Sequence, residues 1–122
     1  MAKIINLTQH QATPEQIAAD VVDLAPADRA RLATLLTFDT LPTRAELDRR
    51  ASDIVEEFAA GYGTAMIGGA PFFMSALERA LDVRAIDAVY AFSVRESVEE
   101  TLPDGTVRKT AVFRHRGFVP AR

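Results

Sequence analysis

Three short apolar segments, separated by stretches with helical periodicity, constrain the fold of this chain more than any other feature. Residues 3–7, 64–67 and 88–93 are rich in Ile, Val, Ala and aromatic side chains, and each has the length of a buried strand. Strands that are joined through helices run parallel to one another. We therefore expect an α/β domain in which these strands are neighbours in one mostly parallel sheet, with helices covering both faces.

Helix starts are indicated by capping residues and by first-turn prolines. Thr13–Gln16 and Thr43–Glu46 each fit a capping box, in which a threonine and a Glu or Gln three residues later satisfy free backbone N–H groups. Pro26 and Pro71 suit the first turn of two further helices. The apolar segment at residues 21–24 predicts a second, short strand between the first two helices.

The last third of the sequence has a different pattern. Residues 97–99 and 107–113 flank Leu102-Pro103-Asp104-Gly105, a turn signal that predicts a C-terminal β-hairpin. Thr106–Arg122 contains five basic residues and no acidic one, which fits either a patch for a small anion or a charged, solvated edge strand. The length of 122 residues, without a repeat or linker, predicts one domain over residues 1–122.

Composition argues against several classes of function. The net charge is −3, whereas a duplex-binding domain is usually broadly basic, so we expect no duplex nucleic acid as a partner. The chain has no cysteine and only two histidines without clustered carboxylates, so we expect no metal and no cofactor. No apolar stretch approaches ~20 residues and no export signal is recognisable, so we expect no membrane span and a cytoplasmic location.

Polar and glycine residues follow each of the three expected strands. They are Thr8-Gln9-His10, Gly68-Gly69-Ala70 and Ser93-Val94-Arg95. In open parallel sheets, ligands bind at the carboxyl ends of the strands, where the winding direction of the chain reverses. The sequence therefore predicts a pocket formed by these three segments.

Each segment has a chemical role and a structural alternative. The N–H groups of Gly68–Ala70, just before a helix, could bind an anion, or the glycines could serve only a tight turn with positive φ. His10 could exchange protons near neutral pH, or it could cap the next helix. Arg95 could bind a phosphate with help from Ser93, or it could pair with a neighbouring glutamate.

Strand alternation also divides the basic residues near the C-terminus. Arg114 and Arg116 are expected on one face of the last strand, which is then cationic. His115 is expected on the other face together with Phe113, where a core-facing position is the more common outcome.

Several of these segments resemble one known family. The first strand, His10 and Thr13-Pro14-Glu15-Gln16 resemble the opening of small CRISPR-associated proteins with Rossmann-like folds. Further residues in the same order and spacing as in that group are Tyr90–Arg95, Glu99, Asp104-Gly105, Val107 and Phe113–Phe118. The chain thus resembles the CARF-related single-domain ring nucleases, which bind or linearise the cyclic oligoadenylate second messengers of type III CRISPR systems.

This resemblance implies a single-domain, Rossmann-like three-layer sandwich with a mostly parallel sheet and a C-terminal β-hairpin. It implies a homodimer and metal-independent cleavage, in which a ribose 2′-hydroxyl of the ligand attacks the adjacent phosphodiester. The implied catalytic residues are His10, Arg95 and Ser93, and the implied ligand-binding residues are Thr8, Gln9, Gly68, Gly69, Ala70, Arg114 and His115. Two positions depart from the family pattern: Gln9 replaces a serine, and Gly68-Gly69-Ala70-Pro71 replaces a loop of the Gly-Asp-Phe-Gly type.

Two functions of other classes also fit the sequence. One is a non-catalytic module that binds or sequesters a nucleotide in the same pocket. The other is a structural or protein-interaction dimer from a mobile element. Linear products from a cyclic oligoadenylate in EDTA would separate cleavage from sequestration.

Overall fold

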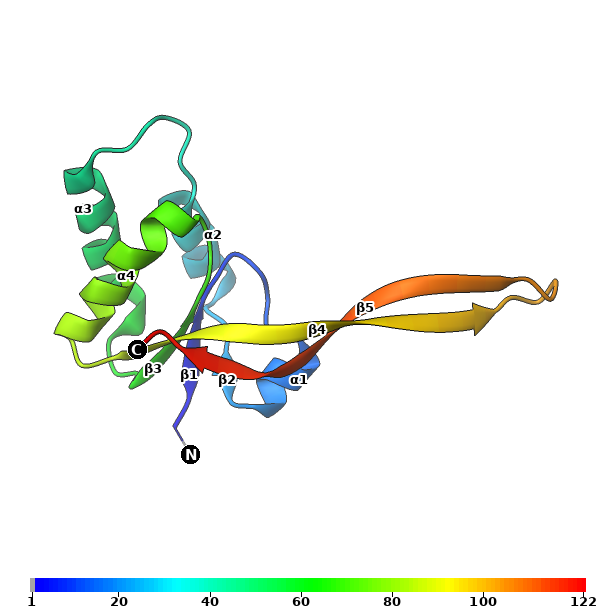
Figure 1. Cartoon of the computed structure of the whole chain (residues 1–122). Helices are drawn as coiled ribbons and strands as arrows, with labels where there is room; N and C mark the ends of the chain where they lie inside the picture. The colour runs from blue at the N-terminus through cyan, green and yellow to red at the C-terminus, as the bar shows by residue number, and fades with distance from the viewer. Residues whose placement is uncertain (1) are drawn as a thin grey trace.

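In the computed structural model, which describes residues 2–122, a five-stranded sheet combines with four α-helices (Figure 1). The predicted α/β class is confirmed. The elements in chain order are β1 (Ile4–Leu7), α1 (Pro14–Ala18), β2 (Val21–Val22), α2 (Pro26–Leu36), α3 (Arg44–Ile54), the π-helical turn η1 (Val55–Ala59), β3 (Thr64–Ile67), α4 (Pro71–Val83), β4 (Asp87–Thr101) and β5 (Val107–Pro120).

The strands are arranged in the order β2-β1-β3-β4-β5. β1 pairs in parallel with both β2 and β3, and β3 pairs in parallel with β4. The prediction that residues 3–7, 64–67 and 88–93 are parallel neighbours is therefore confirmed. β5 pairs with β4 in the antiparallel direction, so the mostly parallel sheet ends in the expected hairpin.

The helix starts follow the local sequence signals. In the capping box before α1, the Gln16 N–H donates to Thr13 Oγ1 and the Thr13 N–H donates to Gln16 Oε1. Thr43 caps α3 by accepting a hydrogen bond from the Glu46 N–H. Pro26 and Pro71 occupy the first turns of α2 and α4.

The main hydrophobic core lies between the sheet and the three longer helices. Buried residues of α2, α3, η1 and α4 all join one cluster with alternate residues of β1 and β3. Its largest fully buried side chains are Phe73, Ile5, Leu7, Leu32, Ile54, Leu77, Leu81 and Val55. This side of the sheet therefore has the helical layer that the sequence predicted.

The opposite face of the sheet has a smaller cluster. It consists of Val21, Met66 and Val89, and no helical residue between positions 2 and 122 belongs to it. The physical reason is the length of α1, because a five-residue helix presents too little apolar surface to form a layer. The expected cover of helices on both faces, and with it the third layer, is thus not confirmed.

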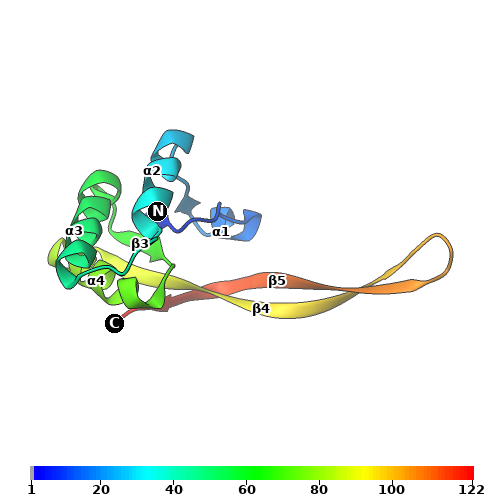
Figure 2. The same cartoon turned by 90° about the horizontal axis from the view of Figure 1, so that it is seen from above.

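A long two-stranded ribbon projects from the body of the protein (Figures 1 and 2). We call residues 92–117 of this ribbon the arm. The sequence predicted a strand at 88–93 and a separate hairpin, whereas β4 runs without interruption for 15 residues and pairs with β5 as far as Thr101 and Val107. A register irregularity lies between Phe92 and Ser93, opposite Gly117, which has a φ of +144°. Glycine is the residue that adopts such a conformation without strain.

Candidate functional site

A cavity of about 530 Å³ opens at the carboxyl ends of β1 and β3 and beside β4, where the sequence predicted a pocket. We call it the strand-end pocket. Its lining residues are Thr8, Gln9, His10, Gln11, Thr13, Gln16, Met66, Ile67, Gly68, Gly69, Tyr90 and Ala91. β1 and β3 are also where the chain changes winding direction, because β1 leads outward to β2 while β3 leads to β4 on the other side. Ligands of open α/β sheets bind at such a point.

The loop after β1 is held by a buried side chain, Asn6. Its Nδ2 group donates to the His10 carbonyl and to Asp23 Oδ1, both at 2.8 Å. Its Oδ1 atom accepts from the Thr8 N–H at 2.9 Å and from Thr8 Oγ1 at 2.7 Å. Asp23 also accepts a hydrogen bond from the Ala12 N–H at 3.0 Å. This network fixes the backbone of Thr8–His10 and leaves the exposed His10 side chain at the pocket.

Asn6 and Asp23 were missed by reasoning from the sequence. In the sequence, Asn6 is a polar interruption of a buried strand. Its hydrogen-bond partner Asp23 lies seventeen residues further along the chain. A polar residue inside a buried strand, one position before the strand ends, is a signal that could have found it, because buried amides need partners.

The glycine pair after β3 forms the second wall of the strand-end pocket. Gly69 has a φ of +150°, so the structural reading of a turn that requires glycine is confirmed at this position. A Cβ atom on Gly68 would lie 3.4 Å from the Thr8 methyl group, which shows how closely the two loops approach. Ala70 caps α4 without a side-chain hydrogen bond and does not line the pocket.

Ser93 and Arg95 lie in the middle of β4 rather than at the end of a strand. Neither lines the strand-end pocket, although Ser93 is only two residues beyond Ala91, which does. The alternative that Arg95 pairs with a neighbouring glutamate is wrong for the described residues. Glu96 pairs with Arg114 and Arg116, and Glu99 pairs with Lys109.

Arg114 and His115 also belong to the arm and lie outside the strand-end pocket. Arg114 and Arg116 both bind Glu96, which confirms that they share a face. The His115 ring lies 4.8 Å from that of Phe118, and its buried Nδ1 atom has no hydrogen-bond partner within residues 2–122. His115 is half-buried while Phe113 is 71% exposed, so only the histidine follows the expectation of a core-facing position.

The site residues predicted from the sequence thus fall into two groups. Thr8, Gln9, His10, Gly68 and Gly69 come together around one cavity. Ala70, Ser93, Arg95, Arg114 and His115 do not line it. Consequently, no lysine or arginine of residues 2–122 contributes to the wall of the strand-end pocket. The one guanidinium on β4 is that of Arg95.

Tyr90 forms the floor between the pocket and α4. Its phenol donates a hydrogen bond to Glu78 Oε2 on that helix. Burial raises the pKa of the Tyr90 phenol well above its ordinary value, and the hydrogen bond and the negative charge of Glu78 add to the shift. The phenol therefore stays protonated near neutral pH and serves as a fixed donor.

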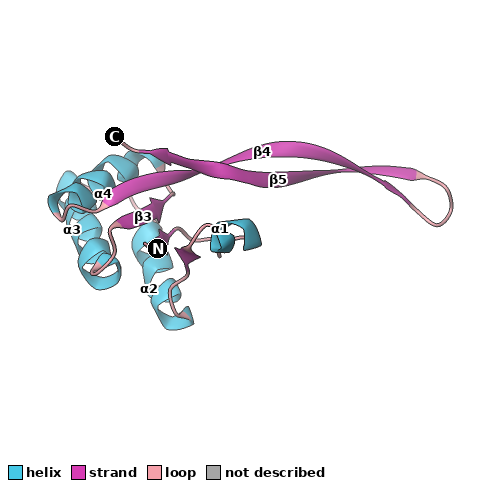
Figure 3. Cartoon of the chain, turned by 90° about the horizontal axis from the view of Figure 1, so that it is seen from below, coloured by secondary structure: helices cyan, strands magenta, loops and turns pink. Residues whose placement is uncertain are grey.

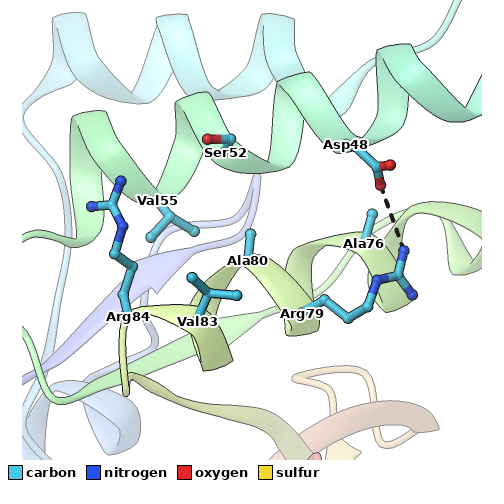
Figure 4. A pocket seen from close by; sticks show the side chains of 8 residues that line it. All are labelled: Asp48, Ser52, Val55, Ala76, Arg79, Ala80, Val83 and Arg84. Carbon is cyan, nitrogen blue, oxygen red and sulfur yellow. Dashed lines mark ion pairs between the residues drawn. The ribbon is translucent and has the colours of Figure 1, made fainter.

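Two other cavities have less suitable chemistry for a small polar ligand. One, of about 420 Å³, lies between α3 and α4, and the Asp48–Arg79 ion pair at 3.5 Å fixes two of its polar groups (Figure 4). Its other lining residues are Ser52, Val55, Ala76, Ala80, Val83 and Arg84. The other, of about 290 Å³, lies beside β4 and includes three carboxylates, those of Glu78, Asp82 and Asp87. Neither has backbone N–H groups of a glycine loop in its wall.

Residues 2–122 contain no group of three or more His, Cys, Asp or Glu side chains placed to hold a metal ion. Within the same residues, none of the helices combines the length and apolar character needed to cross a membrane.

The fold is that of an α/β protein with a parallel core and a projecting β-arm (Figure 3). A ligand-sized cavity lies at the strand ends. The chain belongs to the Uncharacterized protein MJ1673 family, whose model matches residues 2–119. No curated protein and no solved structure matches the chain.

Proposed function

We propose that this protein binds a cyclic oligoadenylate in the strand-end pocket and linearises it without a metal ion, as a ring nuclease of type III CRISPR signalling. The observation that carries the proposal is the meeting of Thr8–His10 and Gly68–Gly69 around one cavity at the reversal point of the sheet. The resemblance of the sequence to the CARF-related single-domain ring nucleases supplies the class of ligand.

The strand order supports a Rossmann-like domain over the whole chain. The order β2-β1-β3-β4-β5 is that of flavodoxin-like doubly wound sheets, in which nucleotides bind where β1 and β3 diverge. Two features depart from that pattern within the described residues: β5 is antiparallel, and one face of the sheet has no helical layer. A cytoplasmic location follows from the proposed ligand.

The proposed reaction requires little chemistry from the protein. A ribose 2′-hydroxyl of the ligand attacks the adjacent phosphorus, the bond to the 5′-oxygen breaks, and the product is a linear chain with a 2′,3′-cyclic phosphate. The protein must align the attack, stabilise charge on the phosphorus oxygens and move protons. The exposed His10 side chain is the pocket's candidate for proton transfer, since imidazole is the most frequent general acid or base in enzymes.

The remaining pocket groups would position the ligand. Thr8 and Gln9 offer neutral hydrogen-bonding groups for a ribose or a base, and the Gly68–Gly69 backbone can approach a phosphate closely. Arg95 would supply the positive charge that the pocket wall lacks, with Ser93 beside it on β4. A ligand with internal two-fold symmetry is best matched by a homodimer, because the interface then repeats the same contacts.

Sequestration without cleavage is the second candidate function. One observation favours it: among residues 2–122, His10 and the proton-retaining Tyr90 are the only titratable side chains that line the pocket. A nucleotide could therefore be bound there without being cleaved. A purely structural dimer, the third alternative, would show no nucleotide binding.

The test is to incubate the protein with cyclic tetra-adenylate or cyclic hexa-adenylate in EDTA and to separate the products by chromatography. We expect linear products from the wild-type protein. His10→Ala should keep its affinity while turnover falls on the order of 100-fold or more, and Arg95→Ala should weaken binding by roughly 1.5–3 kcal/mol.

Arg116→Ala is the matched control for loss of charge on the arm. Its side chain is exposed and paired with Glu96, so its effect on binding should be small and should fade with added salt. Bound but intact ligand would favour sequestration. Unchanged binding and turnover in both His10→Ala and Arg95→Ala would exclude the strand-end pocket as the site.

A further inference from the structure

The arm lacks the packing that normally stabilises a β-ribbon. An isolated two-stranded hairpin is at best marginally stable in water. Yet the arm extends away from the body (Figures 1 and 2). Its apolar side chains are exposed, with Phe92 at 50% and Phe113 at 71%. Its ordered pairing as far as Thr101 therefore points to a partner that covers it.

The length of the arm matches the size of a second copy of the body. From Phe92 to Thr101 the ribbon rises nine residues, or about 31 Å at the rise of an antiparallel strand, and the turn at residues 102–106 extends it further. A domain of about 100 residues has a radius of gyration near 13 Å, which corresponds to a diameter of roughly 33 Å. The arm is thus long enough to span a second body and not much longer.

The charges of the two parts are complementary. Residues 92–117, the arm, have five basic and four acidic side chains, whereas the rest of the chain has nine basic and thirteen acidic ones. A net positive segment that projects from a net negative body cannot contact its own body along most of its length. It can contact the body of a second copy, where the opposite charges attract.

One face of the arm carries the positive charge that the strand-end pocket lacks. Arg95 pairs in register with Phe113, and Ser93 with His115, so these four side chains share a face. Arg95 is exposed and has no ion pair among residues 2–122, while Arg114, Arg116, Arg108 and Lys109 are each paired with a glutamate of β4. The arm therefore has a free guanidinium, whereas no lysine or arginine in the described part of the chain lines the pocket.

We propose that two copies of this chain exchange their arms, and that each Arg95 completes the strand-end pocket of the partner rather than that of its own chain. In a two-fold dimer this exchange is reciprocal, so each pocket receives a guanidinium and each arm packs against the body of the partner. The role of Arg95 at the bound ligand rests on the proposed function, whereas the position of the arm on the partner does not.

A cross-linking experiment tests the position of the arm without any ligand. The natural chain contains no cysteine, so introduced thiols are unique. We expect the double variant His10→Cys/Arg95→Cys, treated with a short bis-maleimide, to migrate as a covalent dimer in a denaturing gel. Both side chains are exposed, so neither substitution should disturb folding.

The matched control for cross-linking is Leu41→Cys/Arg95→Cys. Leu41 is also exposed but lies in the connection between α2 and α3, outside the pocket, so it should give no covalent dimer. If the double variant His10→Cys/Arg95→Cys stays monomeric, or links its two thiols within one chain, the exchange of arms is refuted.

A mixing experiment then tests which chain supplies Arg95 to the site. At a ligand concentration well below its Kd, Arg95→Ala binds little ligand, and His10→Ala turns over on the order of 100-fold more slowly, so each has little activity alone in the proposed mechanism. When the two are unfolded, mixed and refolded together, half of the dimers are mixed, and exchange of arms gives each of these one intact site, so about a quarter of wild-type turnover should return.

No recovery of turnover in the mixture, with little activity in either parent and the wild type active, would show that Arg95 serves its own chain and would overturn the proposal. If the wild-type protein neither binds nor cleaves the cyclic oligoadenylate, the proposed function fails. The cross-link still decides the position of the arm in that case.

Discussion

Replacement of Asn6 by alanine should destabilise the protein more than any other single polar substitution at the pocket. Asn6 is only 4% exposed and makes four hydrogen bonds, to the His10 carbonyl, to Asp23 and to two atoms of Thr8. A typical internal hydrogen bond contributes ~1 kcal/mol net, and a bond to a charged group more. We expect Asn6→Ala to lower the free energy of unfolding by about 2–4 kcal/mol.

Urea denaturation, followed by circular dichroism, measures this loss as a shift of the midpoint at constant slope. Thr8→Ala is the matched control, because it removes only the hydroxyl bonds of the same network and should cost about 1 kcal/mol. The two changes should not add in the double variant, since they share a hydrogen bond. A loss below ~0.5 kcal/mol for Asn6→Ala would refute the view that this network holds the loop.

Three further predictions concern the walls of the pocket. The pKa of Tyr90 lies above its ordinary value of 10.0, so the folded state holds the phenol proton more tightly than the unfolded state does. The free energy of unfolding should therefore fall as the pH rises above 10.0. Alkaline denaturation curves of a Tyr90→Phe variant should lack this fall. Gly69→Ala should cost about 1–3 kcal/mol in urea because of its φ of +150°, whereas Gly63→Ala, with open space around it and no positive φ, should stay within ~0.5 kcal/mol. Thr13→Ala should lower stability by about 0.5–2 kcal/mol through loss of the α1 cap, and an unchanged melting temperature would contradict this.

The body of the fold could be predicted because its signals are local. The strands at 3–7 and 64–67 are apolar on both sides, and Thr13 with Gln16 marks the start of α1 by residue type alone. The arm could not be predicted in the same way. Both faces of an exposed ribbon tolerate polar residues, so the pattern around Ser93–Glu96 shows no alternation, and one strand of 15 residues looked like two short ones.

The candidate site was predictable only where it follows the ends of strands. Thr8, His10 and the Gly68–Gly69 pair could be placed together because parallel strands end at the same edge. Arg95 was placed with them on the assumption that its strand ends at residue 93, and β4 continues past it. The Asn6–Asp23 bond joins residues that only the parallel pairing of β1 and β2 brings together, so no local pattern shows it.

The order of the strands also determines when the sheet can form during synthesis. β1 is an inner strand, and Ile4 pairs with Thr64, sixty residues later. At about 5–20 residues per second, a ribosome takes roughly 3–12 s to make the intervening chain. Throughout that time one edge of β1 has no strand to pair with, and the side chains of Ile5 and Leu7 lack the cover that β3 and α4 later help to provide. Until β3 emerges, the nascent chain therefore exposes an unpaired strand edge beside uncovered apolar side chains, a combination that favours aggregation.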